Sequence, residues 1–283
     1  MEAVNVEQAL SLARKPNGDH PSSSTLEAQV LLARILNRPR AVILAHPEME
    51  LSPDQEQRYR HELADIRAGV PLPYVTGWQE FYGRRFEVSR DTLIPRPETE
   101  GLIEQALMKL RRVETPRVAD VGTGSGCIAV TLACEGKPAM ILASDCSYAA
   151  LRVASRNARM HGVLEQVTLL QADLLTPIHG RFDLICANLP YIPRERLTDL
   201  AVARHEPTLA LDGGREGLET TVRFIRQLPG LLVENGTALL EIDHGQGQAL
   251  QSIAAEALPG WGAGVKCDPA GLERLLIIER SGG

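Results

Sequence analysis

The sequence predicts an α/β fold in which a doubly wound, mostly parallel sheet follows a small helical bundle. From residue 97 onward, short apolar runs typical of buried strands alternate with helical segments. Such alternation is typical of parallel sheets that carry helices on both faces. Before Gly69, in contrast, the apolar residues recur at helical spacing and form no convincing strand. These two observations predict a helical part followed by a larger α/β part.

The helical part is expected to span residues 1–72. Its clearest helix begins with Ser52 as the N-cap and Pro53 at the first helical position, with Gln55 at the third. This combination is a strong start signal, and Gly69 marks the expected end. Residues 73–90 are rich in aromatic and other β-favouring residues interrupted by glycines. They predict a β-hairpin connector.

The third part, residues 91–283, is expected to hold the sheet. Its first element is a helix whose apolar stripe runs from Leu102 to Leu110. Strand-like runs then lie at 118–121, 140–144, 167–170, 182–187, 238–242 and 275–278. Helical segments separate several of these runs, which favours parallel pairing.

Composition is that of a globular protein, with 44% hydrophobic and 23% charged residues. The formal net charge of −6 argues against stable nucleic-acid binding over a broad surface. No apolar run approaches the ~20 residues that span a bilayer, and the first residues lack the pattern of a signal peptide. The five cysteines form no C-x-x-C pair, so we expect reduced thiols in a cytoplasmic protein without a metal site.

A glycine-rich turn follows the first strand-like run. Asp120 and Val121 end the run, and the turn reads Gly122-Thr123-Gly124-Ser125-Gly126. Glycines let a backbone approach a ligand closely, and the next helix offers free N–H groups. The spacing differs from the dinucleotide fingerprint, and Asp120 suits a cationic or hydroxyl-bearing ligand better than a pyrophosphate. The alternative is a plain turn that closes a βα unit.

Two acidic residues end the next two runs. Asp145 lies where doubly wound folds place an acid that accepts hydrogen bonds from ribose hydroxyls. Asp173 is expected to face an adenine ring, with Leu174 lining that pocket. The alternative for each acid is a simple cap at a strand end or helix start. Together with the glycine turn, these residues predict a nucleoside-containing cofactor.

The fourth run ends in Asn188-Leu189-Pro190-Tyr191, beside the first strand in this topology. An amide nitrogen is a poor nucleophile, so both its N–H groups must be held by acceptors. The Asn188 side-chain oxygen and the Leu189 carbonyl can supply them, while Tyr191 offers a flat face to a planar group. We therefore predict methyl transfer to a planar nitrogen, with Asn188 and Tyr191 as catalytic residues and all four residues contacting substrate.

These motifs together resemble the class I S-adenosylmethionine-dependent methyltransferases, which have a seven-stranded, Rossmann-like sheet. More closely, the chain resembles the HemK/PrmC family of release factor glutamine methyltransferases. The resemblance is most specific at residues 92–100, TLIPRPETE, and continues at Glu206-Pro207 and in residues 211–218. It implies transfer of a methyl group to the side-chain nitrogen (N5) of the Gly-Gly-Gln glutamine in class 1 peptide chain release factors, with S-adenosylhomocysteine as product.

The resemblance also implies residue roles. Residues 122–126, Asp145, Leu174 and Asn188 would line the cofactor site, and residues 188–191 would hold the glutamine. The helical domain would help to hold the release factor.

One residue departs from the family pattern, because Leu189 stands where the family usually has proline. Adenine-specific DNA methyltransferases carry D/N-P-P-Y/F, and some ribosomal RNA dimethylating enzymes carry N-L-P-Y. Two alternatives therefore remain beside the leading prediction. The first is a methyltransferase for another nitrogen, either adenine in DNA or RNA or a glutamine of another protein. The second is a non-catalytic module that binds a translation factor.

Overall fold

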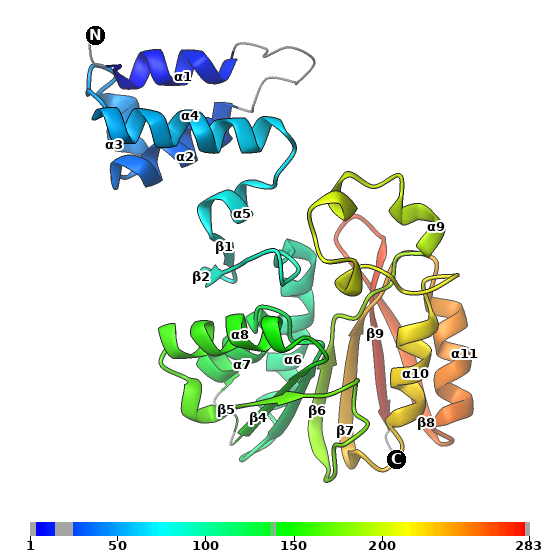
Figure 1. The fold of residues 1–283 in the computed structure, drawn as a ribbon. Helices are drawn as coiled ribbons and strands as arrows, with labels where there is room; N and C mark the ends of the chain where they lie inside the picture. Colours follow the sequence, from blue (N-terminus) through cyan, green and yellow to red (C-terminus); the bar gives the residue numbers. More distant parts are fainter. Residues whose placement is uncertain (1–3, 15–24, 137, 139, 281–283) are drawn as a thin grey trace. The chain divides into compact units, whose positions relative to one another are not determined.

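The computed structural model describes residues 4–14, 25–136, 138 and 140–280. Residues 1–3, 15–24 and 281–283 of the expected domains lie outside the described residues. The chain divides into two compact units, Met1–Trp78 and Gln79–Gly283. Figure 1 shows the helices of the first unit and the sheet of the second.

The first unit is helical. Its helices are α1 (Val6–Arg14), α2 (Thr25–Leu36), α3 (Arg40–Ala45), α4 (Pro53–Arg67) and α5 (Leu72–Thr76). An aliphatic cluster with one buried tyrosine, Tyr59, forms its core. The predicted start of α4 is confirmed: the Ser52 hydroxyl accepts from the Gln55 N–H at 3.2 Å, and the Gln55 side chain accepts from the Ser52 N–H at 2.9 Å. This capping box satisfies two N–H groups that the helix leaves free.

The β-hairpin is present but shorter than predicted. Strands β1 (Trp78–Phe81) and β2 (Arg84–Glu87) form a two-stranded sheet. Tyr82 and Gly83 join them with φ values of 50° and 66°, as a type I′ hairpin turn requires. The expectation of strand structure before Trp78 is wrong, because Leu72–Thr76 forms α5. Prolines at 71 and 73 suit a helix start, and Gly77 ends the helix in the left-handed region with φ 83°.

The second unit contains a seven-stranded sheet in the order β5-β4-β3-β6-β7-β9-β8. The strands are β3 (Arg117–Val121), β4 (Met140–Asp145), β5 (Val167–Gln171), β6 (Phe182–Ala187), β7 (Leu232–Glu241), β8 (Trp261–Cys267) and β9 (Glu273–Arg280). The first five pair in parallel, and β9 pairs antiparallel with β7 and β8. The predicted doubly wound, mostly parallel sheet is confirmed.

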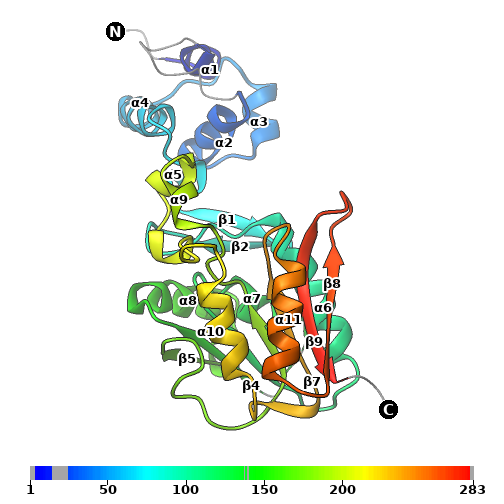
Figure 2. The same cartoon turned by 90° about the vertical axis from the view of Figure 1, so that its right-hand side faces the viewer.

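Helices cover both faces of this sheet (Figures 1 and 2). On one face lie α6 (Glu100–Leu110), α7 (Cys127–Gly136) and α8 (Tyr148–Met160), and on the other lie α10 (Glu219–Gln227) and α11 (Gly247–Ala257). Short helical turns complete the connections: η1 (Pro97–Thr99), η2 (Leu164–Gln166), α9 (Arg194–Leu197), η3 (Ala201–Arg204) and η4 (Thr208–Ala210).

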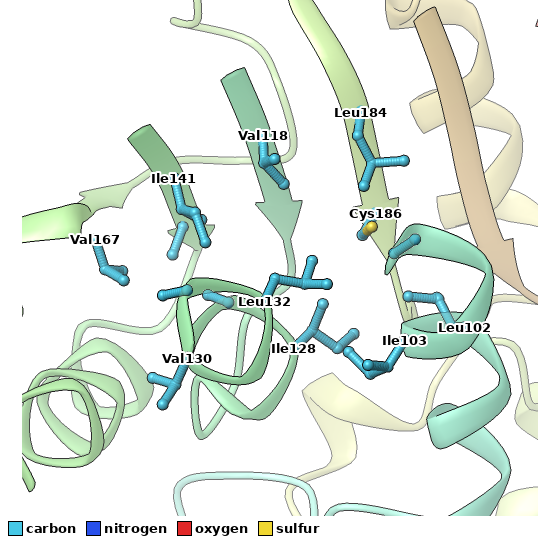
Figure 3. Packing of buried hydrophobic residues seen from close by; sticks show 14 of the residues in the cluster. Leu102, Ile103, Val118, Ile128, Val130, Leu132, Ile141, Val167, Leu184 and Cys186 are labelled. Carbon is cyan, nitrogen blue, oxygen red and sulfur yellow. The ribbon is translucent and has the colours of Figure 1, made fainter. Parts of the chain in front are cut away.

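Two apolar clusters hold these layers together. Figure 3 shows the first, in which Ile103 of α6 and Ile128 and Leu132 of α7 pack against Val118 and Leu184 of the strands. The second contains residues of β3 and β6 that alternate with those of the first, together with buried residues of α10 and α11. Alternate residues of each strand thus fill opposite faces, as the pleat requires.

The strand register brings the predicted motifs to one edge of the sheet. Val121, the last residue of β3, pairs with Ser144 of β4 and with Ala187 of β6. The glycine turn, Asp145 and Asn188 therefore all begin where neighbouring parallel strands end. Because β4 and β6 flank β3, this edge is the switch point of the sheet, where α/β folds form their ligand crevice.

Candidate active site

A cavity of about 340 Å³ opens at this edge of the sheet. Three of the predicted motifs line it: Gly122 to Ser125 of the glycine turn, Asp145, and Asn188 to Pro190. Asp173 and Leu174 line it from the turn after β5. The structure thus brings together, from four strand ends, ten of the thirteen residues that sequence analysis assigned to one site. Of the remaining three, Gly126 completes the glycine turn, and Asp120 and Tyr191 do not line the cavity.

The glycine turn has a backbone that side chains would disturb. Gly122, Gly124 and Gly126 have φ values of 73°, 55° and 81°, in the left-handed region that glycine adopts without strain. A Cβ atom on Gly122 would lie 3.1 Å from Leu189 Cδ2, and one on Gly126 would lie 3.1 Å from Ala154 Cβ. The turn is therefore packed between the tetrapeptide and α8, and it exposes main chain to the cavity.

Asp120 does not line the cavity, although the sequence predicted a carboxylate that faces the ligand. It is fully buried behind the turn. Its Oδ2 accepts from the Thr123 hydroxyl at 2.6 Å and from the Ala129 N–H at 3.1 Å. Burial raises the pKa of Asp120 to about 7, because removal from water disfavours the charged form. This side chain ties the turn to the start of α7.

Asp145 is half-buried at the cavity wall. Its Oδ2 accepts from the Gly124 N–H at 2.9 Å, and its Oδ1 accepts from the Ser147 N–H at 2.8 Å. Ser147 is the N-cap of α8, with its hydroxyl accepting from the Ala150 N–H at 3.2 Å. Since each carboxylate oxygen has two lone pairs, Asp145 can brace the turn and still accept from a ligand. The cap interpretation and the ribose interpretation are thus compatible.

Asp173 and Leu174 differ in their surroundings. Asp173 is exposed and forms an ion pair with Arg223. Leu174 is buried and has a φ of 54°, which is unusual for a non-glycine residue. The backbone of Leu174 therefore turns sharply here, while its side chain joins the apolar cluster beneath α10.

A buried hydrogen-bond network lies beside the tetrapeptide. The Asn188 side-chain N–H donates to Thr99 Oγ1 at 3.1 Å, and the Thr99 hydroxyl donates to Glu241 Oε2 at 2.6 Å. The Tyr191 hydroxyl donates to Glu241 Oε1 at 3.4 Å. Tyr191 does not line the cavity, so the flat face that the sequence predicted for the substrate is not presented there. Sequence analysis assigned no role to Thr99 or Glu241.

Another wall of the cavity is formed by Thr92, Leu93, Pro95 and Arg96. The buried carboxylate of Glu206 holds this segment, because it forms an ion pair with Arg96 and accepts from the Ile94 N–H at 3.3 Å. Two stretches that carry the family resemblance, residues 92–100 and Glu206-Pro207, are thereby brought together. The signal for these wall residues was the resemblance, since no local pattern gives them a chemical role.

The fold and the site together identify the class of protein. The exposed main chain of the glycine turn and the half-buried carboxylate of Asp145 fit a ligand with a nucleoside and a charged amino-acid part. A methyltransferase from Pyrococcus furiosus matches 81% of this chain and 100% of its own, with a TM-score of 0.55 at 14% identity. The hMettl16 catalytic domain matches 82% of this chain and 83% of its own, with a TM-score of 0.57 at 13% identity. This chain has the fold of the class I S-adenosylmethionine-dependent methyltransferases.

Sequence comparisons define the family within this class. The PrmC N-terminal domain family matches residues 8–77, and the methyltransferase small domain family matches residues 101–205. The release factor glutamine methyltransferase of Moorella thermoacetica is 43% identical over 90% of this chain and 91% of its own. That of Deinococcus radiodurans is 38% identical over 92% and 93%. The chain belongs to the release factor glutamine methyltransferase family.

Proposed function

We propose that this chain transfers a methyl group from S-adenosylmethionine to the N5 nitrogen of the Gly-Gly-Gln glutamine in class 1 peptide chain release factors. The observation that carries the proposal is the position of Asn188, which ends β6 next to the glycine turn, with its side-chain N–H group engaged by Thr99. Its Oδ1 is then available to a substrate N–H. The family membership supports the same reaction.

The chain's own residues hold and orient the reactants. S-adenosylmethionine, when bound, supplies a methyl group on a positively charged sulfur and leaves as S-adenosylhomocysteine. Gly122 to Ser125 and Asp145 would hold its amino-acid and ribose parts, and Leu174 would border the adenine. Asp120 contributes indirectly, because its hydrogen bonds shape the turn.

The substrate glutamine nitrogen must expose its lone pair. Asn188 Oδ1 accepts one substrate N–H and the Leu189 carbonyl accepts the other, which turns the nitrogen toward the methyl donor. This is positioning and electrostatic catalysis, so the site needs no strong base. The glutamine nitrogen loses its proton to solvent after the new bond has formed. Tyr191 contributes from behind the turn, through its hydrogen bond to Glu241.

Substrate docking is the role we propose for the helical unit. All residues that line the cavity lie between Arg90 and Arg223, in the second unit. The first unit, which matches the PrmC N-terminal domain family, therefore has another task, and we infer that it binds the body of the release factor. Since release factors act in the cytoplasm, we place the reaction there. Within the described residues, no helix has the length and apolarity to cross a membrane.

The test is incubation of the purified chain with a purified release factor and isotopically labelled S-adenosylmethionine, followed by peptide mass spectrometry. We expect one added methyl group on the glutamine of the Gly-Gly-Gln peptide. A release factor with that glutamine replaced by alanine is the matched control and should stay unlabelled. Labelling of both proteins, or of ribosomal RNA alone, would contradict the proposal.

A further inference from the structure

We propose that Glu241 and Thr99 are positioning residues that fix the orientation of the Asn188 side-chain amide, so that its oxygen and not its nitrogen faces the substrate. The inference rests on the proposed function and deepens it. It assigns a task to two buried polar side chains that lie far from the tetrapeptide in sequence. The evidence is the direction in which each hydrogen bond of the network must run.

Glu241 sets the direction of the hydrogen bonds in this network. This residue ends β7 and is 5% exposed. An ionised carboxylate accepts hydrogen bonds and donates none. Thr99 is 2% exposed, and its Oγ1 lies 2.6 Å from Glu241 Oε2. The single proton of the Thr99 hydroxyl is therefore committed to Glu241.

The Thr99 oxygen then has only lone pairs left for Asn188. At 3.1 Å from Thr99 Oγ1, the Asn188 amide must present its N–H group. An inverted amide would place two oxygens against each other with no proton between them, and it would turn the N–H groups toward the cavity. There they would meet the N–H groups of the substrate amide. The network thus selects the only orientation in which Asn188 can accept from the substrate.

The second carboxylate oxygen of Glu241 strengthens this arrangement. It accepts from the Tyr191 hydroxyl at 3.4 Å. One buried carboxylate therefore holds both ends of the tetrapeptide, Asn188 through Thr99 and Tyr191 directly. In the chain, Glu241 lies 142 positions from Thr99, and Thr99 lies 89 positions from Asn188.

The network also links the amide orientation to pH. Burial raises the pKa of Glu241 and the nearby Glu98 raises it further, while hydrogen bonds from Thr99 and Tyr191 and the charge of Arg274 lower it. The other ionisable groups coupled to this cluster are Cys127 of α7 and, around Tyr191, Arg96 and Asp243. A protonated Glu241 could donate to Thr99, which would free the Thr99 proton for Asn188 Oδ1. The wrong amide orientation would then be stabilised, so the rate should fall as pH drops through the pKa of Glu241.

The first test compares Thr99→Val with Thr99→Ser. Valine keeps the shape of threonine and removes the hydroxyl, whereas serine keeps the hydroxyl. We expect Thr99→Val to lower kcat on a release factor by about 10- to 100-fold, as loss of one aligned hydrogen bond predicts. Thr99→Ser should retain kcat within about threefold. Affinity for S-adenosylhomocysteine, measured by calorimetry, should change less than about twofold in both.

The second test uses Glu241→Gln. The glutamine oxygen can still accept from Thr99 while its N–H group donates to the Tyr191 oxygen, so the geometry is retained but the group no longer titrates. We expect activity within about tenfold of the unaltered chain at neutral pH, and loss of the acid limb of the pH–rate profile. The double variant Thr99→Val with Glu241→Gln removes the carboxylate that valine would leave without a partner. Its kcat should stay low.

The outcomes separate the inference from the proposed function. If the unaltered chain failed to methylate the release factor, both would be wrong. If it were active, and Thr99→Val kept more than half of its kcat, only the inference would be wrong. Equal losses for Thr99→Val and Thr99→Ser, recovery of kcat in the double variant, or an unchanged acid limb in Glu241→Gln would also overturn it. Because Glu241→Gln replaces one polar group by another of the same size, its pH profile decides the matter even if Thr99→Val folds poorly.

Discussion

Replacement of Leu189 tests whether its carbonyl and its side chain have separate roles. The sequence assigns the substrate contact to the backbone carbonyl. The structure adds that the side chain is 4% exposed and joins the apolar cluster beneath α10 and α11. Its Cδ2 also lies against Gly122. The side chain thus supports the glycine turn, and we propose that the carbonyl contacts the substrate.

The expected magnitudes follow from the atoms removed. Proline keeps three of the four side-chain carbons of leucine, so Leu189→Pro should cost about 1–2 kcal/mol, from one methylene at ~0.8 kcal/mol and a small cavity. Leu189→Gly removes all four and adds backbone freedom, for a cost of about 3–5 kcal/mol. Neither Asn188 nor Leu189 is among the described residues with positive φ. The backbone can therefore accept a proline, provided that φ of residue 189 lies near about −65° and Asn188 stays extended.

Thermal unfolding and steady-state kinetics on one release factor measure the two roles separately. We expect the melting temperature to be highest for the unaltered chain, lower for Leu189→Pro and lowest for Leu189→Gly. At a temperature where all variants are folded, Leu189→Pro should keep activity within about tenfold, while Leu189→Gly should lose more because the carbonyl is less well aimed. Leu189→Ala is the matched control, since it removes packing without adding glycine's freedom. If glycine were tolerated and proline abolished activity, the leucine N–H or side chain would have a role in catalysis, and ribosomal RNA should be assayed as a substrate.

Four further predictions concern the site and the helical unit. Asn188→Ala should lower kcat at least about 100-fold and leave calorimetric affinity for S-adenosylhomocysteine nearly intact, and more than half of native activity would exclude its role. Asp145→Asn should weaken that affinity by about 1.5–3 kcal/mol, because one amide oxygen must replace two carboxylate oxygens; unchanged affinity would leave it only the cap role. Burial raises the pKa of Asp120 from 3.8 to about 7, so its contribution to stability is present below pH ~4 and is lost as pH rises to ~7, by up to about 4 kcal/mol. Asp120→Asn should remove this slope in denaturant unfolding at several pH values, and an identical slope would show that another group titrates. Deletion of residues 1–70 should preserve affinity for S-adenosylhomocysteine and cripple methylation of an intact release factor; full efficiency would contradict the docking role.

Most of the sheet could be predicted from sequence because its strands carry apolar runs. The central strands β3 and β6 are almost fully buried, whereas β5, at one edge, is only partly buried. The runs that became β3, β4, β5 and β6 are short and apolar, and they were located to within one residue at each end. β8 (Trp261–Cys267) was missed. It is an edge strand, its side chains are half-buried or exposed, and it contains two glycines. A strand that buries little apolar surface leaves little periodic signal.

The start of β7 was missed for a related reason. Predicted to begin at Ala238, the strand begins at Leu232 and includes Glu234, Asn235 and Gly236. These residues are typical of turns. Its pairing with β6 also shifts register between Phe182 and Leu184. Tertiary pairing here overrides local preference, which no single segment of sequence can indicate.

Local patterns located the ends of the strands, and topology then placed those ends at one edge. This is why the glycine turn, Asp145 and Asn188 could be assigned to one site. The direction of a side chain is harder to predict, but Asp120 shows that the alternation of side chains along a strand determines it. It alternates with Ala119 and shares the face of Val118, which packs beneath α6 and α7. Its carboxylate therefore points beneath α7, where it meets the Ala129 N–H.

The Glu241 network could not have been predicted in this way. Glu241 stands between Leu240 and Ile242 near the end of the predicted run 238–242, and a strand-end acid is most often solvated. Its burial depends on α6 and η1 covering that end of β7, and its function depends on Thr99 lying within 2.6 Å. Such a contact joins two segments whose local patterns carry no information about each other. A buried carboxylate with a hydroxyl on one oxygen and a phenol on the other has its ionisation opposed by burial, so it persists at a cost to stability. The orientation that it imposes on Asn188 is the functional gain that would justify this cost, and the pH profile of Glu241→Gln is therefore the measurement that connects the fold to the chemistry.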